Sequence, residues 1–337
     1  MQTTTYKPAV SPSLGQKRSI SKMQIGMLLA IVVVAALPLV LTNYRLLQLS
    51  QILVFAIALL GLNLLTGFNG QISLGHGAFY AVGAYAVAIM LDKTGVPYWA
   101  AIPIAGGLSF VVGFLFGLPA LRLEGHYLAL ATFALAIAVP QILKYNALGE
   151  WTGGVQGLSV VQPSAPWGLP LGSDQWLYYF CLAWAIVLFV LGWNLLRGRI
   201  GRAIVAIPQH HIAAETMGIN TSYYKAVMFG ISAMYTGMAG GLGALLAQFV
   251  SPDSFHIGLS ILFLVGIVVG GSGSLSGALF GAIFIQYVPH VAENISKSAP
   301  AAIYGVLLIV LVYFFPTGIA GVLRRLASRR TVSTANK

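Results

Sequence analysis

The chain has 337 residues, of which 58% are hydrophobic and only 7% are charged, and its formal net charge is +11. Soluble domains carry about 25% charged residues, so this composition excludes a folded protein whose whole surface faces water. The basic residues stand beside long apolar runs, a pattern typical of the cytoplasmic loops of membrane proteins. We therefore expect a lipid bilayer, and no nucleic acid, as the partner of this surface.

The N-terminal segment, residues 1–22, is rich in Thr, Ser, Pro and Lys, and we predict that it is disordered and cytoplasmic. The apolar run 24–42 follows Lys17, Arg18 and Lys22, as the apolar part of a signal peptide would. Because the run is long and ends without a small-residue cleavage pattern, we predict that it is retained as an anchor.

Nine further apolar runs follow, and together the ten predict an all-α polytopic membrane protein. They are continuous rather than alternating, which favours helices over the strands of a membrane barrel. Glycine interrupts several runs and one is short, so we expect some to be broken or re-entrant helices. The nine runs cover residues 47–66, 71–91, 98–119, 126–143, 175–196, 225–248, 257–270, 275–293 and 299–315.

Lysine and arginine residues predict the orientation of the chain. They gather before the first run, in the loop after the sixth run, and in the basic tail 321–337. If six runs precede that loop and four follow it, all three basic segments lie on one side of the membrane. We therefore expect both termini in the cytoplasm, with a transmembrane domain at 23–320 between them.

Polar side chains in or beside the runs are sparse, and each is a candidate for lining a translocation path. These candidates are Asn63, Thr66, Asn69, Gln71, Ser73, His76, Thr132 and Gln248. Each could instead form a hydrogen bond between helices, and His76 could be a structural histidine at a glycine-rich bend. No carboxylate lies at mid-membrane depth, which disfavours an autonomous proton-coupled mechanism.

Two glycine-rich stretches resemble each other. Residues 69–75 and 271–277 each precede a run rich in Gly, Ala and Phe. A duplicated half, as in many transporters, and chance similarity both remain open. Glycines also recur at four-residue spacing, as at Gly237 and Gly241, which lets helix backbones approach closely.

The sequence carries no pattern that would make this chain an enzyme. It has no Gly-x-x-x-x-Gly-Lys-Ser/Thr phosphate loop, no spaced cluster of metal ligands and no hydrolytic triad. We therefore expect no cofactor, no metal and no catalytic residue in the chain itself.

The loop after the sixth run predicts a short amphipathic helix. Pro208 can begin it, because the missing N–H costs nothing in a first turn, and Gly218 suits its C-terminal exit. The residues between that suit the helix are Ile212, Ala213, Ala214, Glu215 and Met217. A short helix held between two spans suits docking into the groove of a partner, although an ordinary surface helix has the same pattern.

This loop resembles a known family. Ala213-Ala214-Glu215 followed by Gly218 is similar to the coupling loop of ABC importer permeases, and 201–220 resembles that of the branched-chain amino acid (LivM-like) family. Further stretches agree with that family in order and spacing: Gly61–Gly67 with Gly70–Phe79, Thr152–Gly154 with Gly157 and Leu158, and Ser251–Phe255. One departure is Gln209-His210-His211, where relatives often carry charged residues.

The resemblance implies a type II-like ABC importer permease in a bacterial inner membrane. Such a permease pairs with a homologous second permease, with two cytoplasmic ATPase subunits that bind ATP and magnesium, and with an external substrate-binding protein. The residues it implies for coupling to the ATPase are Ile207, Pro208, Ile212, Ala213, Ala214, Glu215 and Gly218.

The expected function is therefore ATP-driven import of branched-chain or related hydrophobic amino acids. A permease for urea or short-chain amides remains an alternative, as do a passive small-solute channel and a membrane scaffold without transport.

Overall fold

The computed structural model describes residues 37–39, 41–120, 123, 125–166, 171–209, 211–295, 297, 299–314 and 317–323. The chain divides into two compact units, Met1–Thr42 and Asn43–Lys337. In the described part of the first unit there is one short 3-10 helix, η1 (Leu37–Leu39). The segment 1–22, most of the run 24–42 and most of the basic tail 321–337 lie outside the described residues.

The second unit is built from helices, as the apolar runs predict. Its α-helices are α2 (Asn43–Leu62), α3 (His76–Ile89), α4 (Tyr98–Ala120), α5 (His126–Leu143), α6 (Gly149–Thr152), α7 (Ser173–Arg197), α8 (Arg199–Ala206), α9 (His211–Thr216), α10 (Thr221–Ala247), α11 (Ile257–Gly270), α12 (Leu275–Ile295) and α13 (Pro300–Phe314). Shorter helical turns are η2 (Asn63–Phe68), η3 (Met90–Thr94), η4 (Asn146–Leu148), η5 (Gly154–Gln156) and η7 (Pro252–Phe255). Two short strands, β1 (Leu158–Ser159) and β2 (Phe249–Val250), pair antiparallel.

Each predicted run from 47–66 to 299–315 holds one of these helices, so the all-α membrane fold is confirmed. Among the described residues, 7 helices are long and apolar enough to cross a membrane. They are Asn43–Phe68, Tyr98–Pro119, His126–Leu143, Ser173–Arg197, Thr221–Ala247, Pro252–Gly270 and Leu275–Ile295. The helices α3 and α13 are shorter, in keeping with the expectation that some runs are not simple crossings.

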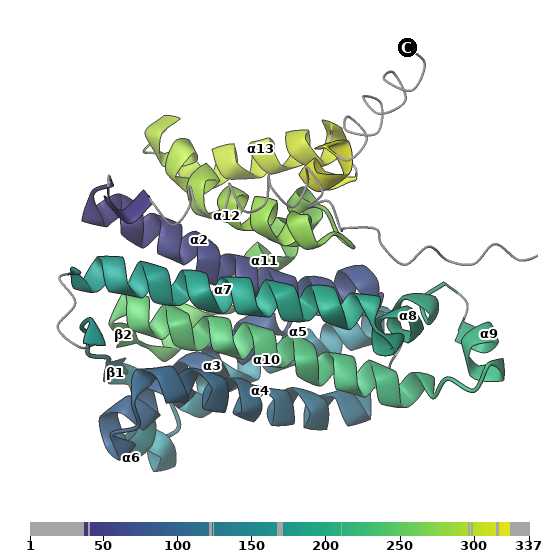
Figure 1. Ribbon diagram of the computed structural model, residues 1–337, viewed down its shortest axis with the longest axis horizontal. Helices are drawn as coiled ribbons and strands as arrows, with labels where there is room; N and C mark the ends of the chain where they lie inside the picture. The colour runs from purple at the N-terminus through teal and green to yellow at the C-terminus, as the bar shows by residue number, and fades with distance from the viewer. Residues whose placement is uncertain are drawn as a thin grey trace, which may run out of the picture. The chain divides into compact units, whose positions relative to one another are not determined.

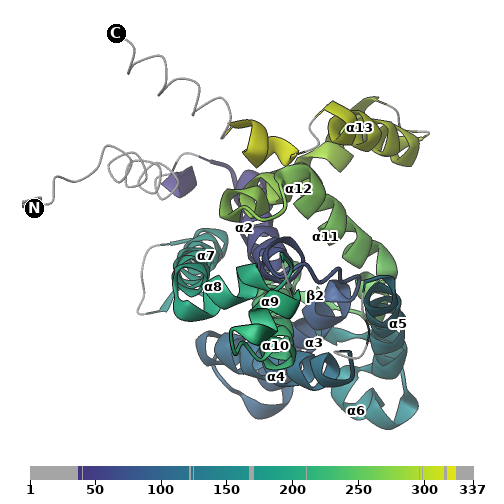
Figure 2. The same ribbon diagram turned by 90° about the vertical axis from the view of Figure 1, so that its right-hand side faces the viewer.

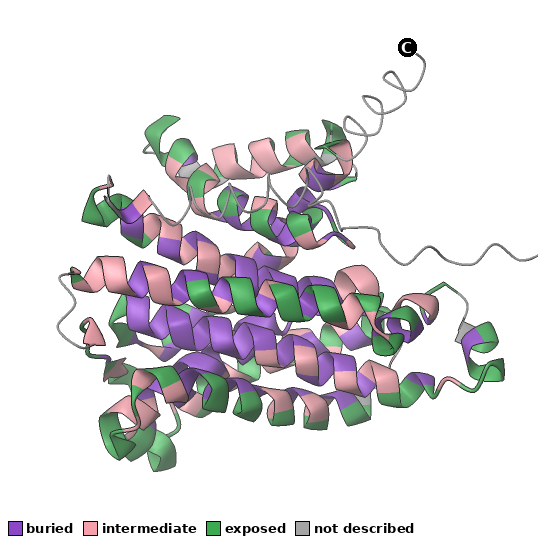
Figure 3. Cartoon of the chain, viewed as in Figure 1, coloured by how far each residue is buried: buried purple, intermediate pink, exposed green. Residues whose placement is uncertain are grey.

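Helix α10 forms the centre of this unit and packs against α2, α3 and α4 (Figure 1). Buried residues follow most of its length, whereas α4 and α7 turn exposed faces outward (Figure 3). Glycine makes the close packing possible, because an added Cβ at Gly83 would collide with the backbone of Gly237. At Gly240 it would meet the backbone of Tyr80, so α3 and α10 are in main-chain contact.

Helix α3 begins in the interior of the bundle rather than at its end. His76, its first residue, contacts Ser232 of α10, which lies about 17 Å from the start of α10 at ~1.5 Å per residue. The predicted run 71–91 is therefore split into a non-helical part before His76 and a helical part after it. Such broken helices are typical of transporters, where irregular backbone lies inside protein.

The two ends of the long helices differ in character. Helices α8 and α9 lie at one end, beside the end of α7 and the start of α10, and the strand pair lies at the other (Figure 1). Viewed onto the α9 end, α7 and α5 lie on opposite sides of α10 and α3 (Figure 2). We call these the α9 end and the β1–β2 end.

Candidate functional site

The short helix predicted in the loop after α7 is present as α9, His211–Thr216. It closes on Gly218, whose φ is 79°. The amide of Ile219 donates to the carbonyl of Ala214 at 3.1 Å, and that of Gly218 donates to Glu215 at 2.9 Å. This pair of bonds is the Schellman exit, which favours glycine because only glycine adopts a left-handed conformation without strain.

Pro208 does not begin this helix, and that detail of the prediction is wrong. It lies in the turn that extends α8, where the amide of Gln209 donates to the carbonyl of Ala206. Ile207 in the same turn is buried, so its side chain holds the turn against the bundle. The helix α9 starts only at His211.

Helix α9 turns apolar side chains away from its own protein. Ile212 is 78% exposed and Met217, in the turn that follows, is 84% exposed, whereas Ala214 is buried. The carboxylate of Glu215 accepts from the hydroxyl of Thr221 at 2.8 Å. The α9 segment is thereby tied to the first turn of α10 and presents two large apolar side chains to a binding partner.

A polar chain runs through the bundle around His76, which is 1% exposed. The hydroxyl of Ser232 donates to the carbonyl of Gly61 at 2.6 Å and therefore accepts from Nε2 of His76, also at 2.6 Å. Nδ1 of His76 then accepts from the hydroxyl of Ser73 at 3.0 Å. The imidazole is neutral and fully paired, which favours its structural interpretation in this state.

The residues before His76, which we call the α2–α3 segment (residues 69–75), are tied to two further elements. The hydroxyl of Thr132 on α5 accepts from the amide of Leu74 at 2.9 Å. The hydroxyl of Thr66 donates to the carbonyl of Gln71 at 2.9 Å. The structure therefore brings Thr66, Gln71, Ser73, His76 and Thr132 together around one segment.

Asn63 joins this region to the α11–α12 turn, residues 271–274. Its Nδ2 donates to the carbonyl of Ser274 at 2.7 Å, and its Oδ1 accepts from the amide of Gly273 at 2.9 Å. Gly67 makes room for this arrangement, since an added Cβ there would collide with Asn63 and Gly273.

Gln248 does not join the other path candidates. It is exposed at the β1–β2 end, about 24 Å along α10 from Ser232 at ~1.5 Å per residue. Its backbone is left-handed, with φ of 58°, and its carbonyl accepts from the amide of Val160 at 2.9 Å. Its role there is to end α10 and begin the strand pair.

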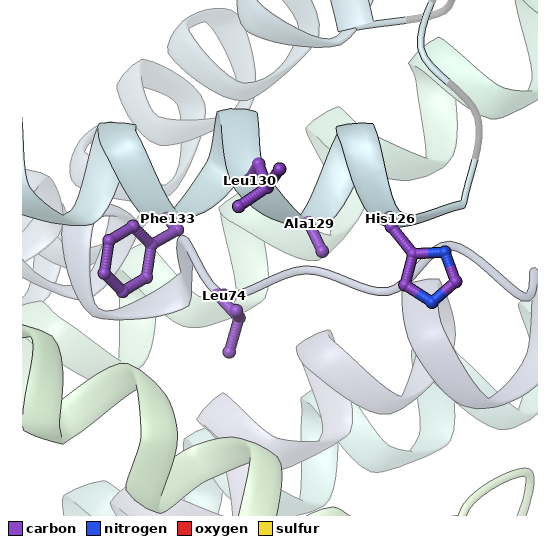
Figure 4. Close-up of a pocket in the computed structure, with 5 residues that line it drawn as sticks. All are labelled: Leu74, His126, Ala129, Leu130 and Phe133. Carbon is purple, nitrogen blue, oxygen red and sulfur yellow. The ribbon is translucent and has the colours of Figure 1, made fainter.

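A groove of about 420 Å³ opens between the α2–α3 segment and α5. Figure 4 shows Leu74 beside the turns of α5 that carry Ala129, Leu130 and Phe133, with His126 farther along at the start of that helix. The lining is Leu74, His126, Ala129, Leu130 and Phe133. With aliphatic and aromatic carbon on its walls and His126 at the first residue of α5, this groove suits a small apolar side chain.

Comparison with known proteins decides the family. The family described as branched-chain amino acid transport system / permease component matches residues 44–315. The chain belongs to this family. This permease is 29% identical to the high-affinity branched-chain amino acid transport system permease protein LivM of Salmonella typhimurium strain LT2, over 87% of the chain and 74% of that protein. No solved structure matches it.

Two further relatives carry similar names. LivM of Escherichia coli strain K12 is 32% identical, over 77% of this permease and 66% of that protein. LivH of Salmonella typhimurium, also a high-affinity branched-chain amino acid transport system permease protein, is 27% identical over 79% and 91%. These relatives are transport permeases and not enzymes, and this permease is a multi-pass membrane protein of the same family.

Sequence reasoning missed two hydroxyl groups of the permease. Ser232 pairs with His76, and Ser260 on α11 accepts from the amide of Gly77 at 2.9 Å. Both are lone serines in apolar helices, where a hydroxyl most often bonds back to its own helix. Among the described residues there is also no group of His, Cys, Asp and Glu that could hold a metal ion.

Proposed function

We propose that this chain is the membrane subunit of an ATP-driven importer for branched-chain or related hydrophobic amino acids in a bacterial inner membrane. The observation that carries the proposal is α9, a short helix that is bonded to α10 and exposes Ile212 and Met217. The family supplies the cargo class, because its members are permease components of branched-chain amino acid transport systems.

The proposed partners follow from the two ends of the long helices. Two ATPase subunits, which bind ATP and magnesium, would dock on the α9 end, and an external binding protein would deliver substrate at the β1–β2 end. A second permease of the same fold would complete the path, since the chain is similar to both LivM and LivH. Both termini would then lie in the cytoplasm, on the side of Arg197, Arg199 and Arg202.

A displacement of α9 by the ATPase would be transmitted to the helix bundle through the hydrogen bond between α9 and α10. The residues proposed for this contact remain Ile207, Pro208, Ile212, Ala213, Ala214, Glu215 and Gly218. Ile212 and Met217 would enter the ATPase, while the Glu215–Thr221 bond would transmit the displacement to the first turn of α10. The Glu215–Thr221 bond ties the six-residue α9 to the first residue of the 27-residue α10.

The apolar lining of the groove beside α5 agrees with a hydrophobic cargo. It presents carbon, which suits an isopropyl or isobutyl group and gives urea or a short amide few hydrogen-bond partners. We therefore place the alternative of a urea or amide permease second.

Reconstitution tests the proposal. The chain is co-expressed with the second permease, the ATPase and the binding protein of its own source, and uptake of radiolabelled leucine and urea into proteoliposomes is measured with and without ATP. Leucine uptake that needs ATP and all subunits is expected. Uptake by the chain alone, or uptake of urea without ATP, would show instead a passive channel.

A further inference from the structure

Two residues at the start of the α2–α3 segment bury side-chain amide atoms that have no hydrogen-bond partner among the described residues. Asn69 is 2% exposed, and neither Nδ2 nor Oδ1 of its amide has a hydrogen-bond partner among the described residues. Gln71 is 8% exposed, and its Nε2 also lacks a partner there. Burying an unpaired amide raises the free energy of the state in which it occurs, so the described state is penalised at this segment.

Gly70, between these two residues, touches the turn before α9. A Cβ added to Gly70 would lie 2.8 Å from Cβ of Pro208, so the backbone of Gly70 is in van der Waals contact with the proline ring. Gly70 also has a φ of 70°, which disfavours any other residue. A displacement of the turn therefore meets the segment at Gly70, with no side chain between them.

The far part of the segment is held firmly. Ser73 and His76 are bonded to α10 through Ser232, and Leu74 is bonded to α5 through Thr132. Gln71 is bonded back to η2, because its main-chain amide donates to the carbonyl of Leu65 at 3.1 Å and its carbonyl accepts from Thr66. Displacement at Gly70 is therefore absorbed within the short loop that these bonds close, since the residues beyond it are anchored on two helices. Within this loop the side-chain amide of Asn69 and Nε2 of Gln71 have no partner among the described residues.

We propose that residues 69–71 form a two-state joint between the α9 end and the broken helix α3. In the described state the side-chain amide of Asn69 and Nε2 of Gln71 are buried and have no partner among the described residues. In the second state, reached when Pro208 moves against Gly70, they pair with water or main-chain groups as the segment opens. Their differential pairing supplies the free-energy difference that a conformational switch requires. This inference rests on the proposed function, because the ATPase is taken to be what displaces Pro208.

The first test replaces Asn69 by Leu in the full complex. Leu removes an unpaired polar group without creating another, so the described state is stabilised and the second state is not. We expect a higher melting temperature for the complex and a loss of at least tenfold in ATP hydrolysis stimulated by the binding protein. Asn63→Leu is the matched control, since both ends of the Asn63 amide are paired, and it should lower the melting temperature.

Two results would overturn the joint. One is a lower melting temperature for Asn69→Leu, which would mean that a resident water already pairs this amide. The other is stimulated hydrolysis equal to that of the unaltered complex. Failure of the proposed function is distinguishable, because the unaltered complex would then show no stimulation at all.

A second test examines the contact itself. Gly70→Ala should abolish stimulation, because the added Cβ strikes Pro208 and the left-handed backbone is strained. Pro208→Gly removes the struck atoms, so the double variant should recover part of the stimulation relative to Gly70→Ala. A double variant no more active than Gly70→Ala would exclude Pro208 as the route.

Discussion

The two glycine-rich stretches that resemble each other in sequence behave differently in the structure. The side chain of Asn63 holds the α11–α12 turn by hydrogen bonds to the main chain of Gly273 and Ser274. The α2–α3 segment is bonded to its neighbours from Gln71 onward, but it leaves the side-chain amide of Asn69 and Nε2 of Gln71 without partners among the described residues. Similar residues thus form a fixed turn in one place and a partly unpaired one in the other. The fixed turn owes its two bonds to the side chain of Asn63, the first residue of η2, and not to its own local sequence.

The largest loss of stability should come from substitutions that disrupt the α11–α12 turn. Asn63→Ala removes an amide that is fully buried, leaves the amide of Gly273 unpaired and takes from the carbonyl of Ser274 one of its two donors, the other being the amide of Gly277. An unpaired buried group costs about 1–3 kcal/mol, so the melting temperature in detergent should fall steeply. Asn69→Ala is the paired comparison. If it destabilises as much as Asn63→Ala does, the contrast between the two turns is lost.

Gly67→Ala disturbs the same turn by adding a methyl group instead of removing a hydrogen-bonding side chain. Its Cβ would collide with the Asn63 side chain and the Gly273 amide, and overpacking costs about 1–3 kcal/mol. Gly305→Ala in α13 is the control, because an added Cβ there meets no atom of the described chain within 4 Å. A thermal melt should separate the two variants clearly. Equal stability would mean that Asn63 can move aside freely.

Ser232→Ala tests the second of the two glycine-rich stretches. It should weaken the attachment of the α2–α3 segment to α10. It leaves Nε2–H of His76 without an acceptor, a loss of about 1–3 kcal/mol. Thr236→Ala is the control, since its hydroxyl bonds only to the carbonyl one turn back. Hydrogen exchange at residues 72–78 should rise in Ser232→Ala alone. Unchanged exchange would show that α5 suffices as the anchor.

The sequence predicts the fold of this permease better than it predicts the contacts of the candidate site. Apolar runs placed the helices, because lipid leaves the backbone no other partner. The sequence suggested a glycine-rich bend at His76, but the start of α3 was not located, because residues 71–75, which mix polar and apolar side chains, were counted in the run. Pairs such as His76 with Ser232, which are 156 residues apart, leave no local pattern. The exit of α9 at Gly218 was predictable, because a Schellman turn is local chemistry.

Substitutions in the α9 segment should have the smallest effect on the stability of the permease. They should have the largest effect on its binding to the ATPase. Ile212→Ser with Met217→Ser changes two side chains that are 78% and 84% exposed, so the melting temperature of the permease should shift little, in line with surface changes within about 0.5 kcal/mol. Co-purification of the ATPase should nevertheless drop. Serine at Val187 and Val190 of α7, two other exposed apolar residues, serves as the control and should leave co-purification intact. If the ATPase still binds the α9 variant, α9 is an ordinary surface helix, and the displacement proposed at Gly70 has to start from another contact.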